Sequence, residues 1–324
     1  MTSKSAILQR IESALSAVEY PRKPEGLYEP IQYVLEEGGK RLRPTLLLLA
    51  YSLYKDDLER AVPAAIGLET YHNHTLLHDD LMDRADMRRG RPTVHKKWDE
   101  NTAILSGDTM LIMAFRHVLA SQGARTMEVL DLFARTAQEI CEGQQYDINF
   151  ESRTDVTVEE YLEMICLKTA VFLGCAVKAG ALIADAPKTD AEALYSFARY
   201  VGLAFQLQDD YLDVYGDPAV FGKKIGGDIL CGKKTFLLVT ALHGADASTK
   251  ARLLDLLADR QMPDAEKIAA VTQIYNEMDI ANLTLRAIDK FYDKARAALD
   301  HVALPEQTLA PLWEYAQSLL GRKN

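Results

Sequence analysis

Residues 71–95 read YHNHTLLHDDLMDRADMRRGRPTVH and place three carboxylates on about one turn of an expected helix. Asp79 and Asp83 stand four positions apart, so on a helix their side chains share one face, about 5–6 Å apart at Cβ. Like charges at this spacing repel each other, and apolar side chains such as Leu77 and Leu81 flank them. Acids embedded in an apolar segment are typical of a lined cavity or a metal site.

The same pattern of acids recurs in the second half of the chain, in the segment FQLQDDYLD. Carboxylate oxygens suit hard cations, and Mg²⁺ typically takes one or two carboxylates together with substrate phosphates. Two such clusters that faced each other would hold several Mg²⁺ ions, with a diphosphate clamped between them. The acids concerned are Asp79, Asp80 and Asp83 in the first cluster and Asp209, Asp210 and Asp213 in the second.

Lysines and arginines gather close to both clusters, although the chain carries a net charge of −10. They lie in GGKRLRP (38–44), in RRG (88–90) and in GKKIGGDILCGKKT (222–235). Glycines let the backbone approach a ligand closely, and arginine binds phosphate oxygens through a planar, always-charged fork. Taken alone, residues 38–44 favour a solvated basic loop, and Arg88-Arg89 is equally a doublet that neutralises Asp83 and Asp86. In 222–235, the repeated glycines and their nearness to Asp213 favour a flexible lid over bound phosphates rather than a lysine-rich surface loop. The spacing of a Walker phosphate-binding loop is absent.

The composition narrows the classes of function. A pI near 5.3 argues against nucleic acid as a partner, because the basic footprint is missing. No uninterrupted run of 18 apolar residues exists to span a membrane, and the amphipathic N-terminus lacks the apolar core of a signal peptide. The four cysteines form no C-x-x-C pair, which favours a reducing compartment, and we expect a cytoplasmic protein.

Apolar residues recur with a helical period almost throughout the chain. We expect a loop at 21–30 and helices at 4–19, 31–35, 45–53, 61–82, 102–120, 126–146, 158–184, 189–215, 234–243, 248–259, 264–275, 279–300 and 308–321. No pair of strands flanks a hairpin turn, and no long linker or fixed-period repeat divides the chain. The simplest architecture is a single all-α bundle formed by residues 1–324.

Two polar patches interrupt long apolar helices. Gln144 and Asp147 lie in GQQYD, and Lys168 and Thr169 lie in LKTA. A lysine that is buried without a partner is energetically unfavourable, so we expect Lys168 to point into a polar cavity.

Taken in order, these motifs resemble those of the trans-isoprenyl diphosphate synthase family. The resemblance runs from about Gly38 to Thr235, through GGKRLRP, HDDLMDRADMRRGRPTVH, GQQYD, LKT, FQLQDDYLD and GKKIGGD…GKKT. It implies a single all-α bundle around a deep central cavity, usually assembled as a homodimer. It also implies a prenyltransferase that condenses isopentenyl diphosphate head to tail with an allylic diphosphate to give an all-trans prenyl diphosphate.

The resemblance further implies a role for each motif. The six aspartates would hold three Mg²⁺ ions that bind the allylic diphosphate. Side chains expected to contact that diphosphate or the adjacent carbocation are Arg88, Lys168, Thr169, Gln206, Lys223 and Lys233. The diphosphate of isopentenyl diphosphate would be held by Lys40, Arg43, His72 and Arg89, while Gln144 would line the site.

Product length in this family depends on the side chains one turn before the first aspartate motif. Here these are His74 and Thr75, about 5.4 Å along the helix from Asp79. A pair of large aromatic residues there implies a short product, and a small residue at the first position implies a long one. His74 is intermediate in size, so the resemblance implies a product of about fifteen to twenty carbons, with the cavity depth set by that turn.

Other functions compete with this one. His78 beside Asp79, with His72, His74 and His95 close in sequence, is compatible with a metal-dependent phosphohydrolase, which leaves the second acidic cluster unexplained. A non-catalytic subunit of a hetero-oligomeric synthase usually has eroded aspartates, whereas all six are intact here. A longer-chain synthase also remains open. A terpene cyclase would share the metal chemistry but generally lacks GGKRLRP and RRG.

Overall fold

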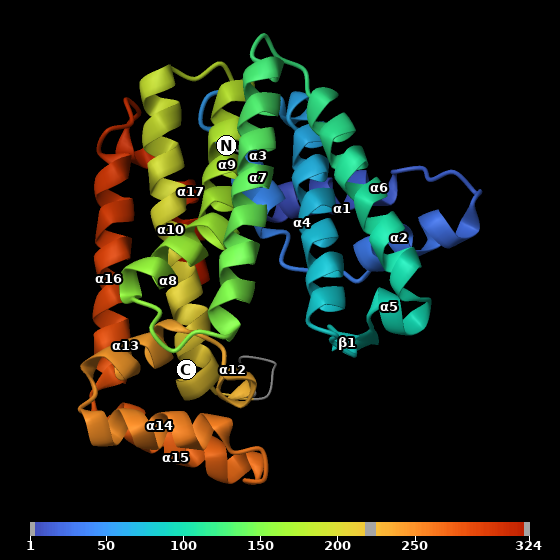
Figure 1. Cartoon of the computed structure of the whole chain (residues 1–324). Helices are drawn as coiled ribbons and strands as arrows, with labels where there is room; N and C mark the ends of the chain where they lie inside the picture. Colours follow the sequence, from blue (N-terminus) through green and yellow to red (C-terminus); the bar gives the residue numbers. More distant parts are fainter. Residues whose placement is uncertain (1–3, 218–224, 321–324) are drawn as a thin grey trace. The chain divides into compact units, whose positions relative to one another are not determined.

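The computed structural model describes residues 4–217 and 225–320, and within these ranges nearly all regular structure is helical (Figure 1). The first half contains α1 (Lys4–Ser16), α2 (Glu25–Glu36), α3 (Leu42–Ser52), η1 (Leu58–Arg60), α4 (Val62–Met82), β1 (Met87–Arg88), β2 (Arg91–Pro92), α5 (Val94–Lys97), α6 (Glu100–Leu119) and α7 (Thr126–Glu151). The second half contains α8 (Val158–Ile165), η2 (Cys166–Ala170), α9 (Val171–Ile183), α10 (Lys188–Tyr215), α12 (Gly227–Cys231), α13 (Phe236–Gly244), α14 (Ala247–Ala258), α15 (Asp264–Glu277), α16 (Ile280–Leu299) and α17 (Glu306–Leu320). The predicted all-α class is confirmed.

The structure corrects the sequence prediction at two places. The segment expected to be a loop at 21–30 is already helical from Glu25, with Pro30 inside α2. A two-residue hairpin also exists where no hairpin was expected, with Met87 opposite Pro92 and Arg88 opposite Arg91. Strands this short carry no alternating pattern that a sequence could show.

The chain divides into two compact units that are interleaved in sequence. Unit 1 comprises Met1–Ala134 and Cys175–Glu192, and unit 2 comprises Arg135–Gly174 and Ala193–Asn324. Three long helices, α7, α9 and α10, contribute residues to both units. The single-domain organisation expected from the sequence stays a prediction.

In unit 1 the core forms around α3 and α4. The apolar run Leu46–Leu49 of α3 is almost completely buried, as expected for a helix that is hydrophobic on every side. Helix α4 packs against α6 at close range, because a Cβ at Gly67 would lie 2.9 Å from the carbonyl oxygen of Ala114. The contact continues toward the end of α4 that carries the first acidic cluster, where a Cβ at Gly107 of α6 would overlap the ring of His78.

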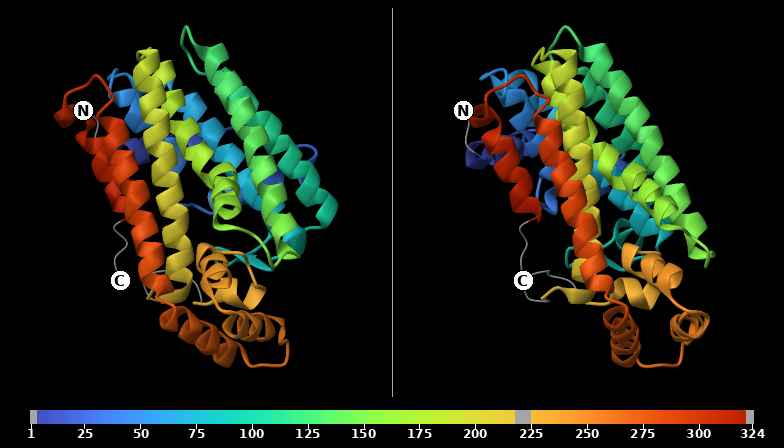
Figure 2. Two further views of the ribbon diagram at one scale, coloured as in Figure 1. Left: turned by 60° about the vertical axis from the view of Figure 1, so that its left-hand side comes forward. Right: turned by 90° about the vertical axis from the view of Figure 1, so that its left-hand side faces the viewer.

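In unit 2 the long helices α10 and α16 lie side by side in both views of Figure 2, and Tyr200 stacks on Phe291 with ring centroids 6.4 Å apart. One buried cluster joins α8, α10 and α13 through Tyr161, Leu207 and Phe236. A second cluster joins α13, α14 and α15. The second acidic cluster on α10 is therefore supported by α8 and α13.

One helical stretch, Val158–Ile183, is long and apolar enough to cross a membrane by length and composition. Of its most apolar window, 72% is buried inside the protein, which is the usual state of a core helix. It is weak evidence for a membrane span.

We expect Gly180→Ala to lower the free energy of unfolding by about 1–3 kcal/mol, because overpacking forces the backbone to shift. A Cβ at Gly180 on α9 would lie 2.1 Å from the carbonyl oxygen of Leu47 on α3. Gly26→Ala in α2 is the matched control, since nothing lies within 4 Å of a Cβ there. Urea unfolding of both variants measures the difference, and equal stability of the two would contradict this account of the α3–α9 contact.

Candidate active site

The first acidic cluster lies at the C-terminal end of α4, with Asp83 as the residue that caps the helix. This is the negative end of the helix dipole, so three acids there need compensating cations. Both carboxylate oxygens of Asp80 accept hydrogen bonds from Nε of Arg88 at 2.8 Å, and Nη2 of Arg88 lies 3.7 Å from Asp79. Burial raises the pKa of Asp80, and Arg88 opposes that shift.

The hairpin β1–β2 directs the two arginines of RRG to different partners, Arg88 to Asp80 and Arg89 to the carbonyl oxygen of Gly38. Arg89 and Gly90 form its turn with φ of 49° and 78°, and a two-residue hairpin turn of this kind requires positive φ at both positions. Nη1 of Arg89 donates a hydrogen bond to the carbonyl oxygen of Gly38. A Cβ at Gly39 would lie only 3.2 Å from Nη2 of Arg89. The RRG and GGKRLRP motifs therefore meet in space, and the glycines of the second make room for the first.

Positive charge concentrates around His72 on α4. Burial lowers the pKa of His72 well below its usual value, and the guanidinium groups of Arg43, Arg89, Arg88 and Arg41 lower it further. These groups must lie close enough to His72 for their charges to act on it. Arg43 and Arg89, two of the residues expected at one diphosphate, thus act electrostatically on a third, His72. The fourth, Lys40, is exposed at the start of the same segment.

Arg41 corrects one sequence interpretation. Residues 38–44 were expected to offer three cations to a ligand, but Nη1 of Arg41 donates to Glu69 at 2.7 Å and its Nε donates to Glu12 at 2.8 Å. Two carboxylates therefore hold Arg41, and Lys40 and Arg43 are the cations of this segment that remain as ligand candidates.

The second acidic cluster lies near the end of α10 and holds the segment that follows it. Asp210 is 3% exposed; it accepts hydrogen bonds from the Tyr161 hydroxyl and, at 3.0 Å, from the backbone N–H of Phe236. Asp213 accepts a hydrogen bond from the backbone N–H of Asp228 at 3.0 Å. Burial raises the pKa of Asp210 to about 7. A cation placed beside it would favour the charged form.

Lys168 lines a small polar cavity of about 50 Å³ in unit 2, together with Thr169, Gln206, Asp210 and Lys233. Its Nζ lies 2.6 Å from Asp147, and the hydroxyl of Thr169 donates to Oε1 of Gln206 at 3.3 Å. Five sequence-predicted residues are therefore neighbours. Gln144 is half-buried on α7. Lys223 lies outside the described residues.

Lys168 and Thr169 belong to a π-helical turn, Cys166–Ala170, between α8 and α9. Such turns in otherwise α-helical segments are frequent at functional sites. Helix α7 approaches this turn so closely that a Cβ at Gly143 would lie 2.3 Å from the backbone nitrogen of Lys168. The glycine of GQQYD thus places Asp147 within reach of Lys168.

The two acidic clusters belong to different units, so their facing arrangement stays a prediction. In the described ranges 4–217 and 225–320, no three His, Cys, Asp or Glu side chains are grouped closely enough to hold a metal ion. The donor set nevertheless suits Mg²⁺, because it consists of carboxylate oxygens. Asp80 and Asp210 would have to exchange protein partners for a metal.

Comparison with known proteins decides the family. The sequence model described as polyprenyl synthetase matches residues 24–278. The chain belongs to the polyprenyl synthetase family. It is 37% identical to a geranylgeranyl diphosphate synthase of Methanosarcina mazei over 318 residues, which cover 97% of this chain and 95% of that relative.

Solved structures of the family have the same fold. A crystal structure of a geranylgeranyl pyrophosphate synthase superposes with a TM-score of 0.92 at 41% identity and covers 100% of both chains. A geranylgeranyl pyrophosphate synthase of Corynebacterium glutamicum, complexed with isoprenyl diphosphate and magnesium, gives a TM-score of 0.86 at 28% identity and covers 99% of this chain and 98% of that one. As a member of this family, the chain is an enzyme of the prenyltransferase class.

Two of the histidines considered for a phosphohydrolase, His74 and His78, contact α6. His78 packs against α6, where its Nε2 lies 3.3 Å from the carbonyl oxygen of Ile104. The Nδ1–H of His74 donates to the carbonyl oxygen of Gly107 at 2.9 Å, and its ring lies 4.6 Å from that of His78. Both histidines therefore support the α4–α6 contact in this polyprenyl synthetase. Together with the family match, this disfavours the phosphohydrolase alternative.

Sequence reasoning missed Tyr161, Glu12 and Glu69, which hold Asp210 and Arg41. Tyr161 looks like any other apolar residue of an amphipathic helix, and Glu12 looks like a surface acid of α1. Only Glu69 carried a signal, because it is an acid inside the apolar run 61–82 and is almost fully buried.

We expect His74 to make the folded state less stable as the pH falls from about 6.5 to about 4. Burial lowers its pKa to about 4, whereas an unfolded histidine binds a proton near pH 6.5. In that window the unfolded state binds more protons, so stability rises with pH and is lost as the pH falls. The full contribution of His74 is about 3 kcal/mol.

Urea unfolding between pH 7 and pH 4 would check this prediction on the wild type and on His74→Gln. The comparison uses the slope of stability against pH, because the substitution also changes packing. A shallower slope in His74→Gln is expected. Parallel slopes would contradict a depressed pKa at this histidine.

Proposed function

We propose that this enzyme condenses isopentenyl diphosphate with an allylic diphosphate, such as dimethylallyl, geranyl or farnesyl diphosphate, and extends the prenyl chain head to tail. The observation that supports this most is the presence of two separate cationic sets, each beside an acidic cluster. One set surrounds His72 in unit 1, and the other lines the Lys168 cavity in unit 2. Two diphosphates need two such sites, whereas a cyclase or hydrolase needs one.

The two sets divide between the substrates as follows. Arg43, His72 and Arg89, with Lys40, would bind the diphosphate of isopentenyl diphosphate, and Gln144 would line the site. Arginine and lysine suit this task because they donate charge-assisted hydrogen bonds to phosphate oxygens. The allylic diphosphate would be bound by Lys168, Gln206, Lys233 and Lys223, and also by Arg88, which pairs with Asp80 of the first acidic cluster.

Mg²⁺ is the proposed cofactor, and its proposed ligands are the two acidic clusters, Asp79, Asp80 and Asp83 and Asp209, Asp210 and Asp213. Six carboxylates form a hard oxygen donor set, and the count of three ions is also a proposal. When bound, Mg²⁺ would neutralise the charge that develops on the departing diphosphate.

The chain's own residues would support the rest of the reaction. Lys168, Lys233 and Arg88 would donate hydrogen bonds to the allylic diphosphate, which leaves with the electron pair of its C–O bond. The hydroxyl of Thr169 and the side-chain carbonyl of Gln206 would orient their dipoles toward the resulting allylic cation. The double bond of isopentenyl diphosphate then attacks this cation, and a proton passes to the departed diphosphate. No protein nucleophile is required.

A homodimer remains part of the proposal. Helix α6 carries Leu105, Ile112 and Leu119 at intervals of seven residues, and each is more than half exposed. Residues at this spacing lie on one face of a helix, so α6 presents an apolar stripe that a second copy of the chain would cover. The proposed location is the cytoplasm, as the cysteine usage suggests.

We expect purified enzyme to form elongated products from isopentenyl diphosphate and an allylic primer in the presence of Mg²⁺, and none with EDTA. Asp79→Asn should lower the rate by about 100-fold or more, because it removes charge stabilisation in the transition state. Asp86→Asn is the control, since Asp86 is exposed and pairs with Lys96 at 2.9 Å. Mass spectrometry of the products reads out both. Diphosphate release without chain extension would instead indicate a cyclase or hydrolase.

Product length is proposed to be about fifteen to twenty carbons, set by the turn of α4 that carries His74 and Thr75. His74→Ala should lengthen the product and His74→Phe should shorten it, because the first opens and the second fills the space one turn before Asp79. The product distribution by mass spectrometry tests both variants. If neither variant changes the length, this turn does not form the floor of the cavity.

A further inference from the structure

The backbone of Arg41 is strained, and this residue lies in the segment 38–44 that also carries Lys40 and Arg43. Its φ of 46° and ψ of 39° are left-handed, and it caps the start of α3. A residue other than glycine adopts this conformation only where its surroundings fix it. Arg41 stands between Lys40 and Arg43, so its conformation sets the direction in which these two side chains leave the chain.

Hydrogen bonds to three partners fix the Arg41 side chain. Glu69 on α4 accepts from Nη1 at 2.7 Å, Glu12 on α1 accepts from Nε at 2.8 Å, and the carbonyl oxygen of Leu35 accepts from Nη2 at 3.2 Å. Glu69 is buried, so its loss would leave the Arg41 charge poorly compensated in the interior. Glu12 differs from Glu69 because it accepts its hydrogen bond from Arg41 at the protein surface.

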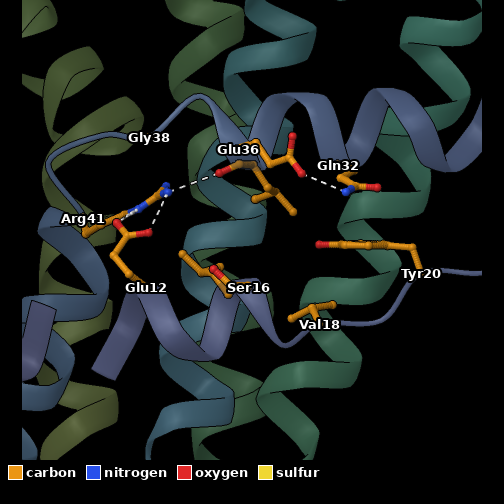
Figure 3. Close-up of a pocket in the computed structure, with 10 residues that line it drawn as sticks. Glu12, Ser16, Val18, Tyr20, Gln32, Glu36, Gly38 and Arg41 are labelled. Carbon is orange, nitrogen blue, oxygen red and sulfur yellow. Dashed lines mark hydrogen bonds and ion pairs between the residues drawn. The ribbon is translucent and has the colours of Figure 1, made fainter. Parts of the chain in front are cut away.

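Glu12 and Arg41 both line an open cavity, and their charged groups face each other there (Figure 3). The cavity has a volume of about 280 Å³ and lies between α1 and α2, lined among others by Ser16, Tyr20 and Gln32. The Glu12 side chain is 51% exposed, so a substitution there buries no uncompensated charge. Helix α1 has a second, independent ion pair to η1, between Arg10 and Glu59.

We infer that Glu12 is a positioning residue for the isopentenyl diphosphate site, acting through Arg41. The inference rests on the proposed function for the identity of the ligand. With Glu12 in place, Arg41 is held from two sides and keeps its left-handed backbone, so Lys40 and Arg43 point in fixed directions. Without Glu12, the Arg41 backbone relaxes and the two cations lose their alignment.

The test is the steady-state kinetics of Glu12→Gln, with Glu59→Gln as the matched control. Glu12→Gln should raise the KM for isopentenyl diphosphate about tenfold, while kcat and the KM for the allylic diphosphate stay near the wild-type values. Glu59→Gln also breaks an ion pair of α1, but one that does not touch Arg41, and should leave all three parameters unchanged. An equal effect of both variants would show that α1 docking matters rather than the bond to Arg41.

A binding measurement separates this inference from the proposed reaction. Calorimetric titration with inorganic pyrophosphate should show weaker binding to Glu12→Gln than to the wild type or Glu59→Gln. If the wild type forms no elongated product but this order of affinities holds, the proposed function is wrong and the positioning role stands. If the wild type elongates and neither KM nor affinity changes in Glu12→Gln, the positioning role is wrong.

Discussion

Repulsion between carboxylates at the end of a helix is the constraint on which unit 1 depends. Three acids lie within five residues at the C-terminal end of α4, which is the negative end of the helix dipole. The structure compensates them with Arg88, which the tight hairpin turn at Arg89 and Gly90 directs back toward α4. The same turn directs Arg89 to the carbonyl oxygen of Gly38. One hairpin therefore positions an arginine at the acidic cluster and another at the cationic segment 38–44.

The fold class and the aspartates of the two acidic clusters could be predicted from the sequence, because both depend on local patterns. Helical periodicity located α4 and α10, and the spacing of aspartates along them was already informative. What could not be predicted depends on contacts between distant segments. Examples are the bond from Tyr161 to Asp210 and the capture of Arg41 by Glu12 and Glu69. No local pattern distinguishes these partners from ordinary core or surface residues.

Cationic residues in this enzyme fall into two groups that a sequence motif does not separate. In GGKRLRP, Arg41 has its charge satisfied within the protein, whereas Arg43 contributes to the positive field around His72. A buried ion pair is a weak source of net stability but fixes geometry strongly. The two arginines of this segment therefore differ in surroundings: Arg41 is held by carboxylates of the protein, and Arg43 belongs to the proposed ligand site.

The π-helical turn at Cys166–Ala170 has a consequence for how this segment can vary. A π turn contains one residue more than an α turn, so deletion of a single residue there would restore a regular α-helix. Such a deletion would leave one residue fewer in the turn, so the side chains within it would be redistributed around the helix axis while the flanking helices keep nearly the same direction. Lys168 and Thr169 lie in this turn, so their positions in the cavity that they share with Gln206 and Lys233 would change. The turn should therefore tolerate the substitution of a side chain better than the deletion of a residue.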